Sequence, residues 1–164
     1  MSQLRDRGTS AQKDVANFGL VRPPFVYLTA ILIGSTLAIQ WPLPFMPGSH
    51  SSLLGGAVVA AAVALFAYAV RTFRAAGTPV PGNEPTTVIV RTGPYRFSRN
   101  PIYLAFSLVQ LGLAIWIDSL WLVGTLIAAL AVMALVVIPR EERYLERKFG
   151  AEYLDYKAAV RRWL

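Results

Sequence analysis

The sequence predicts an all-α integral membrane protein with about four transmembrane helices and a polar loop and tail. Two observations predict this class. Hydrophobic residues make up 55% of the 164 residues, more than a soluble domain of this size usually contains. The net charge is nevertheless +7, because the charged residues are confined to segments outside the apolar stretches. A soluble bundle needs a polar stripe on each helix, and the most apolar stretches offer almost none. We therefore expect a single membrane domain over 1–164.

Four apolar stretches are long enough to cross a bilayer. Each holds about 17 to 19 residues, which as a helix extends roughly 26–29 Å against a hydrocarbon core of ~30 Å. None contains Lys, Arg, Asp or Glu. Backbone polar groups find no water inside lipid, so helices are the expected structure. The predicted transmembrane helices are 25–41, 53–70, 101–117 and 120–138.

The basic residues predict the topology. All 16 Lys and Arg residues lie in the N-terminal segment 1–24, the central loop 71–100 and the tail 139–164. The connections 42–52 and 118–119 hold none. By the positive-inside rule both termini and the central loop are cytoplasmic, in a multi-pass protein expected in the cytoplasmic membrane of a prokaryote. Tryptophans are typical of the membrane interface, and Trp41, Trp116 and Trp121 fall at the opposite one.

Local signals give further detail within these segments. Small residues in 53–70, such as Gly55 and Gly56, permit close contact between helices. The central loop is rich in Gly and Pro, which predicts turns, and Pro101 suits the first turn of a helix. In the tail we expect a helix that ends at Gly150 and a second helix from about Glu152. The second helix carries an apolar face made of Tyr153, Tyr156, Val160 and Trp163.

An ordered set of motifs occupies the second half of the chain. The set is Gly93-Pro94-Tyr95, then Arg99-Asn100-Pro101-Ile102-Tyr103, then Glu141-Glu142, then Phe149-Gly150-Ala151-Glu152-Tyr153-Leu154-Asp155-Tyr156. With a helical hairpin between its second and third parts, this set resembles the isoprenylcysteine carboxyl methyltransferase and phospholipid methyltransferase superfamily of membrane enzymes. The resemblance covers about 87–164. Asn100 stands where the carboxyl methyltransferases usually have His.

The resemblance implies a pocket for S-adenosylmethionine, formed by the loop and the C-terminal amphipathic helices. The residues that it implies for cofactor binding are Gly93, Tyr95, Asn100, Pro101, Tyr103, Glu141, Glu142 and Tyr153. It implies that Arg99 orients the reacting carboxylate of the acceptor, a task suited to the bidentate geometry of a guanidinium. Glu142 is the second expected catalytic residue, because Glu141 or Glu142 is the nearest base if the acceptor is an amine.

We therefore expect methyl transfer from S-adenosylmethionine to a lipophilic acceptor at the cytoplasmic membrane face. Carboxyl methylation of an isoprenylcysteine-like substrate is the first expectation, and N-methylation of a phospholipid amine is the alternative. The expected partners are this lipophilic or lipid substrate and membrane lipids. Topology already accounts for the positive charge, so we expect no nucleic-acid partner. The sequence leaves the oligomeric state and the identity of the acceptor open.

A non-catalytic scaffold or small transporter subunit is a competing interpretation. Ionisable residues inside spans mark transport pathways, and their absence here disfavours transport but leaves a scaffold possible. The chain has no cysteine and a single histidine, His50. With so few ligands of the kind that transition metals prefer, we expect no metal site.

Overall fold

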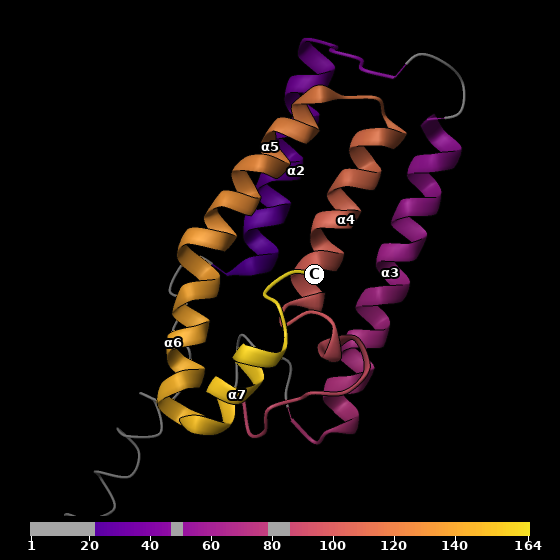
Figure 1. The fold of residues 1–164 in the computed structure, drawn as a ribbon. Coiled ribbons are helices and arrows are strands. Elements are labelled where there is room, and N and C mark those ends of the chain that lie inside the picture. Colours follow the sequence, from indigo (N-terminus) through magenta and orange to yellow (C-terminus); the bar gives the residue numbers. More distant parts are fainter. Residues whose placement is uncertain (1–21, 47–50, 79–85) are drawn as a thin grey trace, which may run out of the picture.

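Four apolar helices stand side by side in the computed structural model, which describes residues 22–46, 51–78 and 86–164. They are α2 (Pro23–Gln40), α3 (Ser51–Ala75), α4 (Pro101–Trp116) and α5 (Leu120–Val132). A short 3-10 helix, η1 (Gly93–Arg96), precedes α4, and a π-helical turn, η2 (Met133–Val137), joins α5 to α6 (Ile138–Phe149). Helix α7 (Ala151–Ala159) folds back beneath the bundle, so that the C-terminus returns to the start of α4 (Figure 1).

The chain is an all-α integral membrane protein, as the sequence predicted. Among the described residues, Pro23–Gln40, Ser51–Ala75 and Leu120–Phe149 are helices long and apolar enough to cross a membrane, and α4 is apolar but shorter. The continuous helix Leu120–Phe149 has 30 residues, about 45 Å against a hydrocarbon core of ~30 Å. Its last part, the charged helix α6, therefore projects beyond the apolar layer.

Several helix ends differ from the ends of the apolar stretches. Helix α3 continues past Val70 through Arg71 and Arg74, because a charged residue ends the hydropathy signal without ending a helix. Helix α7 stops at Ala159, so Val160 and Trp163, expected on its apolar face, lie in the segment that follows it. Most of the predicted N-terminal segment, and His50, fall outside the described residues.

The π-helical turn lies where Pro139 would otherwise break the helix. Proline has no N–H, and its ring clashes with the carbonyl four residues earlier, here that of Leu135. A widened π turn relieves such a clash and lets the helix continue. As a result α6 extends directly from α5 and carries Glu141 and Glu142 to the underside of the bundle.

Glycines set the closest approaches between helices. A Cβ atom on Gly55 of α3 would lie 2.5 Å from the backbone nitrogen of Trp116 and 2.7 Å from the carbonyl oxygen of Gly112, both in α4. Gly34 of α2 makes a similar approach to Leu122 of α5. The close contact that the sequence predicted for Gly55 is confirmed, and α4 is held firmly against α3.

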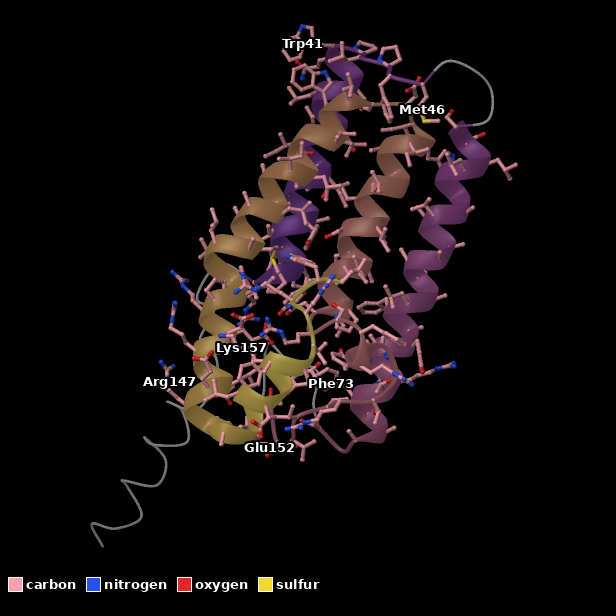
Figure 2. All side chains as sticks on the ribbon, in the orientation of Figure 1. Trp41, Met46, Phe73, Arg147, Glu152 and Lys157 are labelled. Carbon is pink, nitrogen blue, oxygen red and sulfur yellow. The ribbon has the colours of Figure 1, made fainter. Side chains whose placement is uncertain are left out.

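The two ends of the bundle differ in chemistry. At one end Trp121 Nε1 donates to the carbonyl oxygen of Trp41 at 2.7 Å. There Asp118 Oδ1 accepts from the backbone nitrogens of Phe45 and Met46, both at 2.8 Å. Figure 2 shows Trp41 at this end and the basic side chains gathered at the other, where Arg147 is labelled.

Candidate active site

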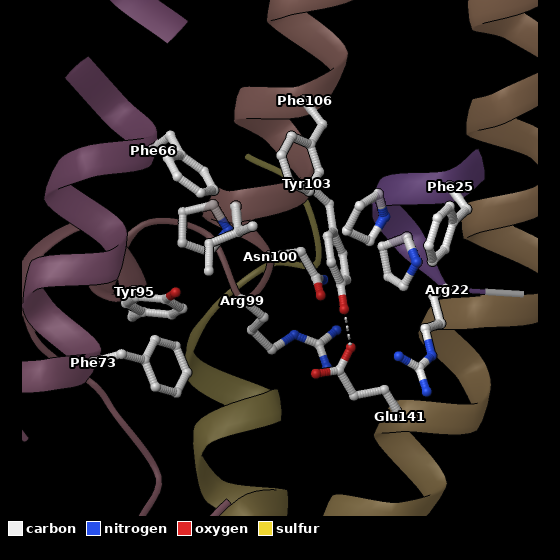
Figure 3. A pocket seen from close by; sticks show the side chains of 14 residues that line it. Arg22, Phe25, Phe66, Phe73, Tyr95, Arg99, Asn100, Tyr103, Phe106 and Glu141 are labelled. Carbon is white, nitrogen blue, oxygen red and sulfur yellow. Dashed lines mark hydrogen bonds between the residues drawn. The ribbon is translucent and has the colours of Figure 1, made fainter. Parts of the chain in front are cut away.

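A cavity of about 470 Å³ lies at the charged end of the bundle, at the start of α4. We call the side chains of Tyr95, Arg99, Asn100 and Glu141 its polar end, and those of Phe25, Phe66 and Phe106 its aromatic end (Figure 3). Pro101 and Tyr103 line it between the two ends. The volume lies in the range that is typical of small-molecule and cofactor pockets.

Glu141 forms part of the cavity lining. The hydroxyl of Tyr103 donates to Glu141 Oε2 at 2.8 Å, across the gap between α4 and α6 (Figure 3). This bond joins the Asn-Pro-x-Tyr segment to the acidic pair. The carboxylate is thereby held where it faces the cavity contents.

Glu142, the next residue, does not line the cavity. It is buried, with 6% of its surface exposed. Its Oε1 lies 3.0 Å from Arg99 Nη1, and Arg162 donates to it from Nε at 3.0 Å and from Nη2 at 2.8 Å. Lys157 Nζ lies farther away, at 3.9 Å. The structure therefore places Glu142 behind Arg99, as the carboxylate that holds this guanidinium.

Arg99 and Tyr95 present buried polar atoms that have no partner. The Arg99 side chain is 9% exposed and uses Nη1 for Glu142. Arg99 Nε and the Tyr95 hydroxyl have no hydrogen-bond partner among the described residues. Burial, helped by the nearby Glu141 carboxylate, raises the pKa of Tyr95 well above its usual range, so its hydroxyl keeps its proton. Because unpaired buried polar groups are costly, these two donors point to a ligand in the cavity.

The loop before α4 and the C-terminal tail fold together. The hydroxyl of Tyr156 donates to the carbonyl oxygen of Tyr95 at 2.7 Å. Arg91 Nη2 donates to the carbonyl oxygen of Glu152 at 2.6 Å. The loop and the tail, about 60 positions apart in the sequence, thus form one wall beneath the bundle. Such a meeting of the two segments is what the ordered motifs required.

Asn100 joins the cavity to the end of the chain. Its Nδ2 donates to the carbonyl oxygen of Arg162 at 2.9 Å, and its backbone nitrogen donates to Ser98 Oγ at 3.1 Å. Asn100 and Pro101 both line the cavity at the start of α4. The amide that replaces the usual histidine therefore secures the C-terminal tail.

Besides Glu142, two more of the expected cofactor residues lie away from the cavity lining. Gly93 has a φ of +58° and lies against α3, where a Cβ would come 2.7 Å from Thr72 Oγ1. Tyr153 is buried behind Arg99, whose Nη1 lies 3.5 Å from its hydroxyl. Burial, with the nearby Glu142 carboxylate, raises the pKa of Tyr153 to about 12. Both residues support the lining residues from behind.

Replacing Gly93 with Ala is expected to lower the stability of the protein by more than replacing Gly77. Both glycines have positive φ, +58° and +68°, but a Cβ on Gly77 meets nothing within 4 Å. Gly77→Ala therefore carries only the left-handed backbone cost of about 1–2 kcal/mol, whereas Gly93→Ala adds the clash with Thr72. Thermal unfolding in detergent measures the difference, and equal losses would contradict the close approach.

Sequence reasoning missed the aromatic end and the part played by Arg162. Phe66 and Phe106 belong to apolar stretches, where nothing separates a cavity residue from a lipid-facing one. Their ring centroids lie 5.5 Å apart. Arg162 belongs to an adjacent arginine pair that reads as a membrane-surface charge, yet its side chain turns inward to Glu142. No sequence signal distinguishes it from Arg161.

Comparisons with known proteins show which family the chain belongs to. A family model described as phospholipid methyltransferase matches residues 50–152. An uncharacterized protein of Haemophilus influenzae is 45% identical over 64 residues, which are 38% of this chain and all of that protein. The protein-S-isoprenylcysteine O-methyltransferase of Saccharomyces cerevisiae is 35% identical over 89 residues, 47% of this chain and 32% of the yeast protein. No solved structure matches. Since the family model covers well over half of its residues, the chain belongs to the phospholipid methyltransferase family.

Proposed function

We propose that this protein transfers a methyl group from S-adenosylmethionine to a carboxylate on a lipophilic acceptor of the isoprenylcysteine kind, at the cytoplasmic membrane face. Family membership and the yeast relative support a membrane methyltransferase. One observation favours the carboxylate acceptor: at the polar end, Arg99 Nε and the Tyr95 hydroxyl are buried and find no partner within the part of the chain that the structure describes. Two buried donors beside a positive charge suit an anionic oxygen acceptor.

The residues present fit S-adenosylmethionine. Glu141 offers a carboxylate to the amino group or the ribose hydroxyls. The rings of Tyr95 and Tyr103 offer faces to a cation or to adenine, and a cation–π contact contributes about 0.5–2 kcal/mol. When bound, the cofactor supplies an electrophilic methyl group on a sulfonium sulfur, which becomes a neutral thioether as the methyl leaves.

The depth of the cavity suits an acceptor that arrives from the membrane. Phe73 of α3 also lines the cavity, with its ring centroid 4.7 Å from that of Tyr95 at the polar end. Along α3, Phe66 and Phe73 lie roughly 22 Å and 33 Å from the start of the helix at Ser51, at 1.5 Å per residue. A hydrocarbon core of ~30 Å would therefore contain the aromatic end, while the polar end sits at its edge. An apolar chain can remain among the phenylalanines while its headgroup reaches Arg99.

The protein's own work is orientation and exclusion of water. A carboxylate is already ionised at neutral pH, so no base has to activate it. Arg99 holds the carboxylate with the side of the guanidinium that Glu142 leaves open, which includes Nε. The Tyr95 hydroxyl donates a second hydrogen bond. Good orientation of two reactants can supply roughly 7–11 kcal/mol of the barrier reduction.

N-methylation of a phospholipid amine is the second candidate. The family description supports it, and so does the position of Glu141 on the cavity lining. An ammonium group must lose a proton before it can attack a methyl group, and Glu141 is the carboxylate placed to accept that proton. In that case Glu141 is essential for transfer, and Arg99 would contact the phosphate of the headgroup and not the reacting nitrogen.

Labelled S-adenosylmethionine separates the two candidates. The purified protein is incubated in lipid nanodiscs with the labelled cofactor and either a farnesylated cysteine or phosphatidylethanolamine. We expect labelling of the farnesylated cysteine as a methyl ester, from which alkaline hydrolysis releases labelled methanol. Base-stable label on the phospholipid, lost in Glu141→Gln, would favour the amine instead. Failure to bind the cofactor by calorimetry under any lipid condition would reject both.

A further inference from the structure

The last five residues, 160–164, reach the back of the cavity although they belong to no helix. We propose that Arg162 is a positioning residue: it engages both oxygens of Glu142, so that Glu142 offers only one oxygen to Arg99 and leaves the Nη2–Nε edge of the Arg99 guanidinium to an acceptor. The proposal rests on the proposed function. It explains why the Glu142 carboxylate does not occupy all the hydrogen-bond donors of the guanidinium that we assign to the acceptor.

The geometry around Glu142 supports this role. Arg162 contacts the carboxylate in a fork, Nε to Oε1 at 3.0 Å and Nη2 to Oε2 at 2.8 Å. Arg99 reaches only Oε1, through Nη1 at 3.0 Å. These hydrogen bonds raise the pKa of Arg162 above its usual range, so the charge of the fork persists at any physiological pH.

The sharing of the Glu142 carboxylate between Arg99 and Arg162 matters because Glu142 and Arg99 are buried. The side chains of Glu142 and Arg99 are 8% and 9% exposed, so water does not readily replace a lost partner. A guanidinium and a carboxylate left alone prefer the bidentate arrangement. Without Arg162, the freed oxygen of Glu142 would turn to Arg99 and take Nη2, the neighbour of Nη1 that an acceptor needs for a fork with Nε.

The backbone of the tail is tied to the same two cavity residues. The nitrogen of Arg99 donates to the carbonyl oxygen of Arg161 at 3.0 Å, and Asn100 Nδ2 donates to that of Arg162 at 2.9 Å. Trp163 packs against the buried core. These contacts do not need the Arg162 side chain, so the tail is expected to stay docked when that side chain is replaced.

A double-mutant cycle tests the proposal. The variants are Arg162→Met, Glu142→Gln and the double variant, with Arg143→Met as a control that removes an exposed arginine next to Glu142 in sequence. We expect Arg162→Met to raise the KM for the farnesylated cysteine at least about tenfold, with cofactor affinity and kcat little changed. In the Glu142→Gln background the same substitution is expected to add little, because a glutamine cannot form the competing bidentate ion pair.

Tryptophan fluorescence provides a readout that does not depend on methyl transfer. Of the four tryptophans, Trp41, Trp116 and Trp121 lie at the opposite end of the bundle, so replacing these three with Phe leaves Trp163 as a reporter of the tail. Unchanged Trp163 emission in Arg162→Met together with the raised KM supports positioning.

Four results would overturn the proposal. A red shift of Trp163 emission would show that the arginine merely fastens the tail. Additive effects in the cycle would show that it does not act through Glu142. A normal KM in Arg162→Met, while the wild type methylates the acceptor, would reject the positioning role and leave the proposed function intact. A wild type that transfers no methyl group to any acceptor would reject both.

Discussion

Replacing Arg99 with Met is expected to lower kcat/KM for a carboxylate acceptor on the order of 100-fold. Arg99 belongs to the polar end of the cavity, and its Nε is a buried donor without a partner in residues 22–46, 51–78 and 86–164. Its loss removes the charge and the fork that align the reacting oxygen, and misplacement by about 1 Å can alone cost about 100-fold. A steady-state methylation assay with the farnesylated cysteine measures the effect.

The matched control for this variant is Arg96→Met. Arg96 lies three residues earlier and is exposed, with its guanidinium over the ring of Phe97, so its loss should leave methylation within about twofold. Arg99→Lys keeps the charge but not the planar fork and should recover only part of the activity. Full activity in folded Arg99→Met protein would remove Arg99 from the acceptor site. Melting temperatures report whether the loss of a partner for buried Glu142 has unfolded the variant.

Replacing Gly55 with Ala is expected to destabilise the bundle by about 1–3 kcal/mol, the usual cost of overpacking. The new Cβ would meet backbone atoms of α4, 2.5 Å from the nitrogen of Trp116. Backbone cannot rotate away as a side chain can, so α3 and α4 must separate. Because the same helix pair frames the cavity between Phe66 and Phe106, cofactor binding should weaken as well. Thermal unfolding in detergent gives the stability change.

Gly56 offers a control one residue along the same helix. A Cβ there finds only a ring atom of Trp116, at 4.0 Å. Gly56→Ala should therefore be neutral or stabilising, since alanine favours helix over glycine by up to about 1 kcal/mol. Equal melting temperatures for the two variants would mean that α3 and α4 do not approach each other as closely as Gly55 indicates.

The membrane helices were predictable from the sequence because apolar length is a direct physical requirement of the bilayer. The ends of these helices were harder to predict. Arg71 and Arg74 end the apolar stretch, but arginine is a good helix former, and α3 runs on to Ala75. Val160 keeps the helical spacing of the tail, yet α7 ends before it, where the chain turns to meet Asn100.

The sequence motifs predicted which segments form the site, but not which role each residue has in it. Glu141 and Glu142 are neighbours in sequence, and successive helix residues point about 100° apart. Only one of them can face the cavity, and nothing in the sequence says which. Phe66 and Phe106 could not be predicted as site residues, for another reason. In an apolar helix, the sequence around a ring that faces a cavity looks the same as the sequence around a ring that faces lipid.

The π-helical turn at Met133–Val137 resolves that ambiguity between the two acids. Such a turn amounts to one residue inserted into a regular helix, so everything after it is rotated by about 100° relative to α5. That rotation is comparable to the angle between adjacent side chains. If the helix were regular at this place, a different side chain would face the cavity, and a different one would face Arg99 and Arg162. The way in which the preceding turn accommodates Pro139 therefore determines which of Glu141 and Glu142 faces the cavity.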